Sequence, residues 1–525
     1  MRAMLAVYDK TGIVELGRGL HELGWELVAT GGTARTLRDG GLPVVEVADL
    51  TGSPEMLGGR VKTLHPKVHG GILYRRGHAE DEAEVARYEV PAIDLVAGNL
   101  YPFVQTVAGE GVMLGDALEQ IDIGGPTLIR AAAKNHPSVL PIVDPADYAA
   151  VLAALRAAGG DAGGVDAAER RRLAAKAFQH VAHYDTAIAE YLRGDDDWLP
   201  AQLTVGMTRV AELRYGENPH QRGAFYTHDS VRTQPGGIGC VVQHHGKAMS
   251  YVNFLDADAA HNLACDFVNP AIAIIKHTNP ACFATAPDAS VAALYERSLT
   301  EGDHVSAYGG IVATNRVVDM TLATALRDVL SPANGARMFY EIVVAPGYDP
   351  DALEHLEKKS KDLRILTAPL GEPRRPRTEV RSVRGGYLVQ DSDVVDDHDF
   401  QVVSDRQPTE AELADLRAAW ILCKHVKSNA VAFVKDGVMI GMGAGQPNRV
   451  GSAALCKAQA GDRALGAVAA TDALIPFPDT VEVCASAGCT VVAHTGGSIR
   501  DDESVAAANR LGISLVVTGV RHFRH

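Results

Sequence analysis

Residues 3–33, AMLAVYDKTGIVELGRGLHELGWELVATGGT, alternate between two apolar runs and one helical pattern. The apolar runs are Ala3–Tyr8 and Trp25–Ala29, and the helical pattern between them is Ile13–Leu23. Short apolar runs joined through a helix are typical of a parallel sheet with crossover connections. In such sheets, ligands bind beyond the carboxyl ends of the strands.

The same alternation continues to about residue 145 and predicts an α/β domain. A second helical stretch is expected at Thr127–Lys134. Three further apolar runs predict strands: Val44–Val47, Asp94–Gly98 and Val139–Val143. From Pro145 to about Leu192 the chain becomes alanine-rich and helical, and the charged stretch Arg193–Asp197 follows. We therefore place a domain boundary after residue 195, giving domains 1–195 and 196–525.

The second domain again mixes strands and helices. Its predicted strands are Ala271–Ile275, Gly310–Ala313, Ile342–Ala345, Ala430–Val434 and Thr490–Ala493. An arginine-rich run at Pro373–Arg384 and an aspartate-rich run at Asp391–Asp399 are typical of solvated loops. We expect this domain to divide into two subdomains near residues 370–400.

Composition excludes several classes of protein. A chain of 525 residues with 46% hydrophobic and 22% charged residues predicts a soluble protein of several folding units. Its net charge of −15 argues against a general binder of nucleic acid or anionic membranes. No apolar stretch approaches the roughly 18 residues that span a bilayer. The seven cysteines are an odd number without a C-x-x-C pair, so we expect reduced thiols and a cytoplasmic location.

Two clusters in the first domain could bind a phosphate. Thr30-Gly31-Gly32-Thr33 follows a strand and precedes a helix, where backbone amides and the helix dipole favour an anion. Lys10 is expected at the same sheet edge, and residues 58–67, GGRVKTLHPK, add Arg60 and Lys62. An ordinary tight turn and a solvated basic loop explain these residues about equally well on local grounds.

Other side chains in this domain suit proton transfer. Tyr101 follows a predicted strand, Asp122 precedes the pair Gly124-Gly125, and Lys134 ends the second helical stretch. A tyrosine, an aspartate and a lysine gathered at one edge can relay protons and stabilise an oxyanion. Ring packing for Tyr101 and helix capping for Asp122 are the alternatives.

Lys276-His277 follows an apolar strand in the second domain. An imidazole moves protons near neutral pH, and an ammonium group stabilises developing negative charge, so the pair suits acyl chemistry. Without further context a surface loop is favoured for such a pair. Polar strings at residues 214–221, RYGENPHQ, and 427–429, KSN, together with Arg449, offer more donors. No P-loop, H-E-x-x-H or G-x-S-x-G motif is present.

Taken in order, the motifs identify a family. The strings are GGRVKTLHP (58–66), NLYPF (99–103), IDIGG (121–125), AAAKNH (131–136), RYGENPHQ (214–221) and KHTNP (276–280). The chain closely resembles, over essentially its whole length, the bifunctional purine biosynthesis enzymes that join an IMP cyclohydrolase to an AICAR transformylase. The resemblance implies a methylglyoxal-synthase-like cyclohydrolase domain at 1–195. It also implies a transformylase at 196–525 built from two cytidine-deaminase-like subdomains.

The resemblance also assigns residues. Lys62, Tyr101, Asp122 and Lys134 would form the catalytic set of ring closure, and Lys276 and His277 that of formyl transfer. The ribose phosphate would be held by Lys10, Thr30, Gly31, Gly32, Thr33 and Arg60. The pocket for AICAR and folate would be lined by Arg214, Tyr215, His220, Asn253, Glu341, Asn429 and Arg449.

The sequence departs from the family pattern at a few positions. Ala6 and Tyr8 stand where relatives usually carry serine, so two hydroxyl groups near the phosphate are missing. Glu341 replaces a frequent aspartate, and Pro476-Phe477-Pro478 replaces a commoner P-F-R string. The zinc signature of deaminases, H-x-E with P-C-x-x-C, is absent, so we expect no catalytic metal.

The implied substrates are AICAR, formyl-AICAR, IMP and, as co-substrate, 10-formyltetrahydrofolate, in a homodimer without nucleic-acid or membrane partners. Two other functions stay open. One is a nucleotide- or folate-binding protein with one silent domain, against which the intact Lys62, Lys276 and His277 argue. The other is a zinc-dependent aminohydrolase, which metal analysis would reveal.

Overall fold

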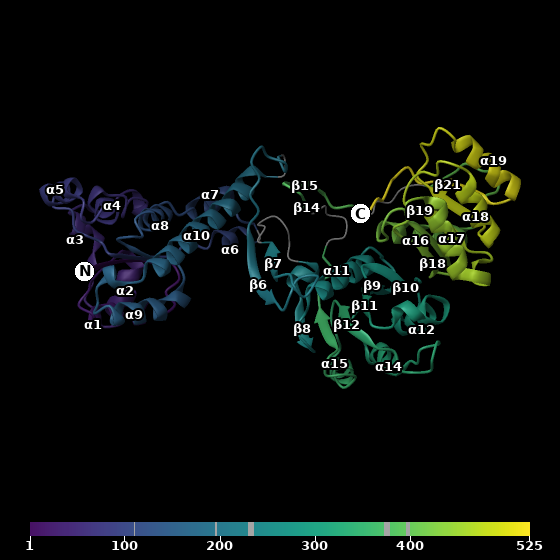
Figure 1. Ribbon diagram of the computed structural model, residues 1–525, viewed down its shortest axis with the longest axis horizontal. Coiled ribbons are helices and arrows are strands. Elements are labelled where there is room, and N and C mark those ends of the chain that lie inside the picture. Colours follow the sequence, from purple (N-terminus) through teal and green to yellow (C-terminus); the bar gives the residue numbers. More distant parts are fainter. Residues whose placement is uncertain (110, 195–196, 229–235, 372–377, 395–399) are drawn as a thin grey trace. The chain divides into compact units, whose positions relative to one another are not determined.

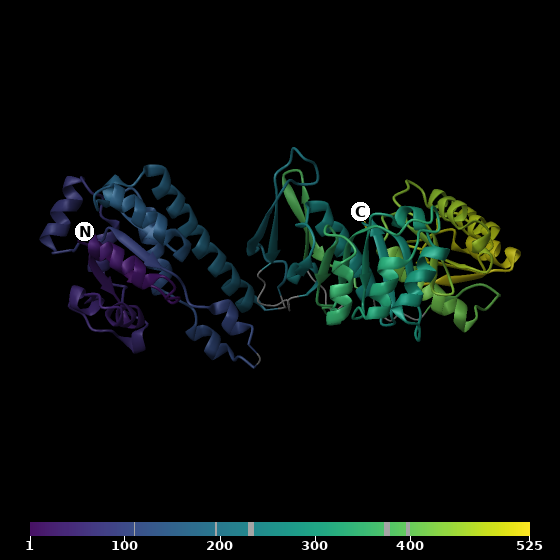
Figure 2. The ribbon, with the colours of Figure 1, turned by 90° about the horizontal axis from the view of Figure 1, so that it is seen from below.

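The computed structural model describes residues 1–109, 111–194, 197–228, 236–371, 378–394 and 400–525. Its contacts divide the chain into two compact units (Figures 1 and 2). Unit 1 is built on Met1–Thr208, and unit 2 on Arg209–Thr227 and the described residues from 236 to His525. The predicted boundary at residues 195–196 and parts of the two charged runs lie outside the described residues.

Unit 1 contains a five-stranded parallel sheet in the order β3-β2-β1-β4-β5. The strands are β1 (Arg2–Ala6), β2 (Glu26–Ala29), β3 (Val45–Glu46), β4 (Leu95–Gly98) and β5 (Leu140–Ile142). Each of the five predicted apolar runs coincides with one of them, which confirms the α/β prediction for this part of the chain. The first strand ends earlier than predicted, at Ala6 rather than Tyr8.

Helices cover both faces of this sheet because successive side chains of a strand point to opposite sides. Ala3 and Leu5 of β1 belong to a core shared with α1, α2 and α9, whereas Met4 belongs to a core shared with α4 and α8. The helices of unit 1 are α1 (Ile13–Glu22), α2 (Gly31–Asp39), α3 (Val47–Thr51), α4 (Pro66–Leu73), α5 (Ala79–Arg87), α6 (Phe103–Val107), α7 (Leu114–Glu119), α8 (Gly124–Lys134), α9 (Tyr148–Ala157) and α10 (Ala167–Arg193). The longest of these helices, α10, is prominent in Figure 2 and packs against α8.

Unit 2 contains one mixed sheet in the order β16-β21-β20-β19-β17-β18-β10-β9-β11-β12-β13-β8. Its strands are β8 (Val242–His245), β9 (Ala271–Lys276), β10 (Asn279–Thr285), β11 (Gly310–Thr314), β12 (Tyr340–Ala345), β13 (Arg364–Thr367), β16 (Gln401–Val402), β17 (Val431–Lys435), β18 (Val438–Gly443), β19 (Val468–Thr471), β20 (Val491–His494) and β21 (Ser514–Val517). All five strands predicted for this region are present.

The sheet of unit 2 consists of two halves with the same topology. The series β10-β9-β11-β12-β13 recurs as β18-β17-β19-β20-β21, with the same antiparallel and parallel pairings. The halves join where β10 pairs antiparallel with β18, at Ala284 and Val438. Equivalent strands therefore run in opposite directions, and the turns of the β9–β10 and β17–β18 hairpins lie at opposite edges of the sheet.

The helices of unit 2 repeat in the same way. One face of the sheet packs against α11 (Tyr251–Cys265) in the first half and α16 (Glu410–Lys424) in the second. The other helices are α12 (Val291–Glu301), α13 (His304–Ala307), α14 (Met320–Asp328), α15 (Pro350–Glu357), α17 (Arg449–Ala460), α18 (Asp479–Ala487) and α19 (Asp501–Leu511). Side chains of α12, α14, α15, α17, α18 and α19 form the core on the opposite face.

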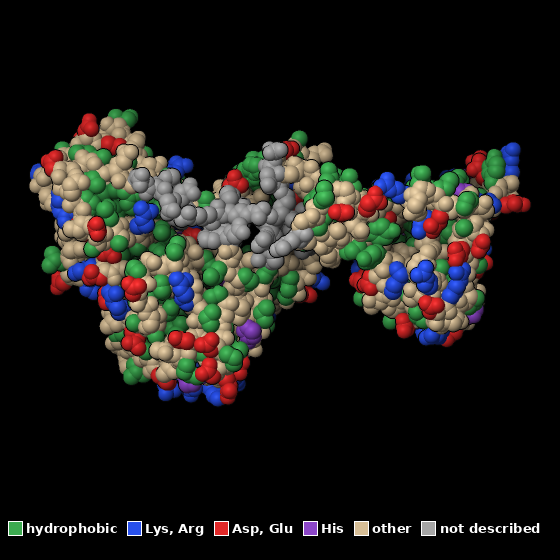
Figure 3. All heavy atoms as spheres, turned by 180° about the vertical axis from the view of Figure 1, so that it is seen from behind, with side chains coloured by type: hydrophobic (Ala, Val, Ile, Leu, Met, Phe, Trp, Pro, Cys, Tyr) green, Lys and Arg blue, Asp and Glu red, His purple; other side chains and the backbone are tan. Residues whose placement is uncertain are grey.

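Two small ribbons complete the described chain. They are β6 (Met207–Leu213) with β7 (Gly223–His228), and β14 (Thr378–Val383) with β15 (Gly386–Asp391). On the surface seen in Figure 3, Lys and Arg side chains are interspersed with Asp and Glu. Among the described residues, no helix has the length and apolar character needed to cross a bilayer.

Candidate active sites

The glycine turn of unit 1 brings two lysines to the start of α2. The backbone of Gly31 is left-handed, with φ of 40°. A Cβ added to Gly31 would lie 3.6 Å from Nζ of Lys62, and one added to Gly32 would lie 3.8 Å from Cε of Lys10. Two ammonium groups thus approach the amino end of a helix, where its unpaired N–H groups and its dipole already favour an anion.

The loop after β1 is tied to its neighbours by side chains. The backbone N–H of Val7 donates to Oγ1 of Thr33 at 3.2 Å, and that hydroxyl donates to the Val7 carbonyl at 2.9 Å. These bonds take the place of ladder pairing, which explains why β1 ends at Ala6. Lys10 Nζ donates to the carbonyls of Val7 and Tyr8, and burial lowers the pKa of Lys10.

Arg60 and Lys62 each pair with a carboxylate. Arg60 forms an exposed ion pair with Glu119, and Lys62 Nζ lies 2.8 Å from Oε1 of Glu55. An anionic ligand at the start of α2 would compete with Glu55 for Lys62.

Asp122 and Tyr101 lie near this edge of the sheet. Asp122 Oδ1 accepts from the N–H of Gly125 at 2.8 Å, so the carboxylate holds the first turn of α8. Burial raises the pKa of Asp122, which suits a group that carries a proton. Tyr101 is 42% exposed, and its ring makes an edge contact with the Tyr8 ring, with centroids 5.5 Å apart.

Lys134 lies at the opposite end of α8 from Asp122. The helix has 11 residues, and its length is about 16 Å at the usual rise per residue. The structure therefore places Lys62, Lys10, Tyr101 and Asp122 around the carboxyl ends of the strands, and Lys134 one helix length away.

In unit 2, Lys276 and His277 lie at a two-residue hairpin turn between β9 and β10, whose flanking residues Lys276 and Asn279 are paired. The two turn residues, His277 and Thr278, both have left-handed backbones, with φ of 52° and 60°. This conformation suits glycine or asparagine, and in a β-branched residue such as Thr278 it is rare and strained. Such strain is concentrated at functional sites. Lys276 Nζ donates to the Tyr308 carbonyl at 2.7 Å, and His277 is exposed.

Strand directions bring several other predicted residues to the same edge, which we call the Lys276 edge. It contains the end of β9 and the starts of β12 and β17. Glu341 lies at the start of β12 and pairs with Arg364 at 2.8 Å. Asn429 lies two residues before β17, and nearby the N–H of Lys427 approaches Oδ1 of Asn279 at 3.5 Å.

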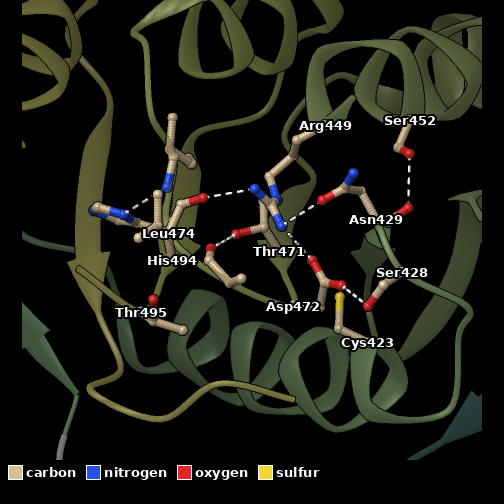
Figure 4. Close-up of polar contacts among 12 residues, drawn as sticks. Cys423, Ser428, Asn429, Arg449, Ser452, Thr471, Asp472, Leu474, His494 and Thr495 are labelled. Carbon is tan, nitrogen blue, oxygen red and sulfur yellow. Dashed lines mark hydrogen bonds and ion pairs between the residues drawn. The ribbon is translucent and has the colours of Figure 1, made fainter. Parts of the chain in front are cut away.

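Arg449 is the centre of a buried polar network (Figure 4). Its Nη2 donates to Oδ1 of Asn429 and to Oδ1 of Asp472, both at 2.8 Å, and its Nη1 donates to the Leu474 carbonyl at 2.6 Å. Ser428 Oγ donates to Oδ2 of Asp472 at 2.5 Å. The arrangement fixes the orientation of the Asn429 amide at the Lys276 edge.

The remaining predicted binding residues lie on α11 and on the ribbon that packs against it. Asn253 forms a capping box with Ser250 at the start of α11 and is 9% exposed. Between β6 and β7, Arg214 and His220 are exposed and Tyr215 is partly buried, with the Arg214 guanidinium 5.7 Å from the Tyr215 ring. Phe225 of β7 stacks on Phe254 of α11, with ring centroids 4.1 Å apart.

A separate cavity of about 800 Å³ lies between α11, the β14–β15 ribbon and the C-terminal segment. Its wall includes Lys424 and His425, each 2.6 Å from Oδ2 of Asp266. Neither Lys276 nor His277 lines this cavity, so it is distinct from the turn that carries them. Within the described part of the chain, no group of three or more His, Cys, Asp or Glu side chains is placed to hold a metal ion.

Two buried carboxylates near the Lys276 edge were not found from the sequence, namely Asp256 and Asp472. Both lie outside the polar motifs: Asp256 is in α11, and Asp472 directly follows β19. A signal for Asp256 exists in an internal repeat: Ser250, Asn253 and Asp256 have the same spacing as Thr409, Glu412 and Asp415.

These features define a two-part α/β protein, in which two lysines approach the amino end of α2 in one unit and a Lys-His pair occupies a hairpin turn in the other. The model of the MGS-like domain matches residues 12–127, and that of the AICARFT/IMPCHase bienzyme matches residues 132–459. The chain belongs to the AICARFT/IMPCHase bienzyme family.

Similar proteins extend over the whole chain. The bifunctional purine biosynthesis protein PurH of Anoxybacillus flavithermus is 46% identical over 527 residues, which cover 100% of this chain and 99% of that protein. The protein of the same name from Bacillus cereus (strain AH820) is 45% identical over 529 residues, with the same coverage. A solved structure titled "Crystal structure of ForH" is 44% identical, covers 37% of this chain and 98% of its own, and has a TM-score of 0.34.

Proposed function

We propose that the chain performs two consecutive reactions of purine biosynthesis. In unit 2, a formyl group passes from 10-formyltetrahydrofolate to AICAR, and in unit 1 the resulting formyl-AICAR closes to IMP. The observation that carries the proposal is the strained turn that presents Lys276 and His277 together at one sheet edge.

Formyl transfer needs help with both protons and charge. The AICAR amine is a weak nucleophile because its lone pair is delocalised toward the neighbouring carboxamide. As it attacks the formyl carbon, His277 takes or relays the amine proton, while Lys276 stabilises the oxyanion of the tetrahedral intermediate. The bond from the formyl carbon to folate N10 then breaks, and N10 leaves with a proton that Lys276 helps to supply.

The substrates of unit 2 must be held in register. We assign this role to Arg214, Tyr215, His220, Asn253, Glu341, Asn429 and Arg449. The buried network of Figure 4 supports the assignment of Asn429, because its amide oxygen is already fixed by Arg449 and its orientation costs little on binding.

Ring closure in unit 1 joins the carboxamide nitrogen to the formyl carbon, and water leaves. Lys62 stabilises the oxyanion, and Tyr101 and Asp122 move protons. Lys134 belongs to the same proposed set, but it lies a helix length from Asp122 and therefore acts indirectly, through its positive charge. Lys10, Thr30, Gly31, Gly32, Thr33 and Arg60 hold the ribose phosphate. The approach of Lys10 and Lys62 to the start of α2 supports this phosphate site. Thr33 contributes through its backbone, because its hydroxyl is bonded to Val7.

The lysines supply the positive charge that each oxyanion requires, so we propose no catalytic metal. We further propose a cytoplasmic homodimer without nucleic-acid or membrane partners. The net charge of −15 supports the exclusion of polyanionic partners, and two-fold dimers are the commonest closed assemblies.

The test is to mix the purified chain with AICAR and 10-formyltetrahydrofolate and to follow the nucleotide by mass spectrometry. We expect gain of a formyl group followed by loss of water. Accumulation of formyl-AICAR would contradict the assignment of unit 1, where Ala6 and Tyr8 replace serines. Absence of formylation would favour a binding protein, and loss of the AICAR amine that a chelator prevents would favour an aminohydrolase.

A further inference from the structure

The turn that carries His277 is held by a buried carboxylate on the neighbouring helix. Asp256 of α11 is 5% exposed, and its Oδ1 accepts from the N–H of Thr278 at 2.7 Å. The N–H of His277 is directed at the same carboxylate and favours its charged form. One side chain from a different element thus holds the backbone of the left-handed turn.

In the second half of unit 2, an aspartate of a helix holds a two-residue turn in the same way, at the opposite edge of the sheet. Asp415 of α16 accepts from the N–H groups of Asp436 and Gly437, both at 2.7 Å. Asp436 and Gly437 form the two-residue turn between β17 and β18, and their φ values of 50° and 77° are again left-handed. Each aspartate lies six residues after the N-cap of its helix, Ser250 or Thr409.

The two turns differ in sequence. Asp-Gly is a favoured pair for a two-residue hairpin, because both residues adopt left-handed backbones at low cost. His277-Thr278 is unfavourable there, and a β-branched residue makes it more so. The second turn would therefore form readily without its aspartate, whereas the first depends on its hydrogen bond to Asp256.

We propose that Asp256 is a positioning residue for formyl transfer, which fixes the imidazole of His277 by holding the His277-Thr278 turn. The proposal rests on the role assigned to His277 above and adds a residue to that site. Asp256 itself does not reach the substrate, because its carboxylate is buried and engaged with the backbone of the turn.

The experiment compares Asp256→Asn with the matched variant Asp415→Asn in the full chain. Both changes keep the size of the side chain and replace one acceptor oxygen by an NH2 group that faces an N–H. We expect Asp256→Asn to lower kcat of formyl transfer about 10- to 100-fold, the cost of misplacing a reacting group by about 1 Å. KM for AICAR should change less than about threefold, because the substrate contacts remain. Asp415→Asn should leave kcat within about threefold of the parent, although it removes an equivalent contact.

A rescue separates positioning from general destabilisation. In Asp256→Asn/Thr278→Gly, glycine adopts the left-handed backbone without Asp256. We therefore expect kcat of the double variant to be at least about tenfold higher than that of Asp256→Asn, with Thr278→Gly alone as the reference. This double variant also serves if Asp256→Asn does not fold. Equal losses of kcat in Asp256→Asn and Asp415→Asn, or no recovery in the double variant, would overturn the proposal.

His277→Ala distinguishes this proposal from the one on which it rests. If His277→Ala retains formyl transfer, the assignment of the site is wrong. If His277→Ala loses formyl transfer but Asp256→Asn keeps kcat, only the positioning role is wrong. Cyclization of supplied formyl-AICAR, assigned to unit 1, measures the amount of active chain in every sample.

Discussion

Replacing Asp472 by alanine should strongly destabilise unit 2. The carboxylate is 1% exposed, and it accepts from Arg449 at 2.8 Å and from Ser428 at 2.5 Å. Arg449 is itself only 8% exposed, so removal of Asp472 leaves a buried cation without its counter-charge. Asn429, which shares the same guanidinium nitrogen, should also lose its fixed orientation.

The magnitude follows from these contacts. Breaking a buried ion pair by deleting one partner costs about 3–5 kcal/mol. Two hydrogen bonds to a charged group, at about 1.5–3 kcal/mol each, lead to a similar range. Arg449 retains its bonds to Asn429 and the Leu474 carbonyl, which favours the lower end. We therefore expect Asp472→Ala to lower the free energy of unfolding of unit 2 by about 3 kcal/mol, which is roughly 100-fold in the unfolding equilibrium constant.

The assay is hydrogen exchange of β19 amides in increasing denaturant, read by mass spectrometry, since this strand lies within unit 2 and directly precedes Asp472. The control is Glu482→Ala, which breaks the exposed pair between Glu482 and Arg510 and should cost less than about 1 kcal/mol. If Asp472→Ala lowers the free energy of unfolding as little as the control does, the reasoning is refuted. Formyl transfer should fall in Asp472→Ala, while cyclization of supplied formyl-AICAR persists.

Three further predictions concern the two sites. Lys276→Ala and His277→Ala should each lower formyl transfer at least about 100-fold without affecting cyclization, and normal transfer in either variant would contradict its role. Lys62→Ala should lower cyclization about 10²- to 10³-fold, and Lys134→Ala only about tenfold because it lies at the far end of α8; equal losses would contradict this difference. Because burial raises the pKa of Asp122, the neutral form is favoured in the folded state, and its contribution to stability is complete below pH 3.8 and is lost as the pH rises through the raised pKa. Asp122→Asn should therefore remove this pH dependence of the free energy of unfolding and increase the stability of unit 1 at neutral pH while slowing cyclization. The measurement is denaturant unfolding of unit 1 at a series of pH values, and the same pH dependence in Asp122→Asn as in the parent would disprove the prediction.

The local signals of the sequence were sufficient for most elements. Apolar runs such as Trp25–Ala29 predicted strands because a buried strand needs only a few consecutive apolar side chains. The second helical stretch was expected at Thr127 but begins at Gly124, because Asp122 binds the N–H of Gly125 and holds the glycine pair in the helix. Capping by a residue outside the apolar pattern is hard to detect from periodicity.

The sequence by itself determined the family, the alternation of strands and helices, and the residue types available for chemistry, since these depend on local order along the chain. Only the tertiary structure decided which side chains meet. It places Asp256 under the turn of His277 and Asp472 against Arg449, and it places Lys134 a helix length from Asp122. Burial and hydrogen bonding between residues far apart in sequence depend on the order of strands in the sheet, and no short stretch of sequence contains that order.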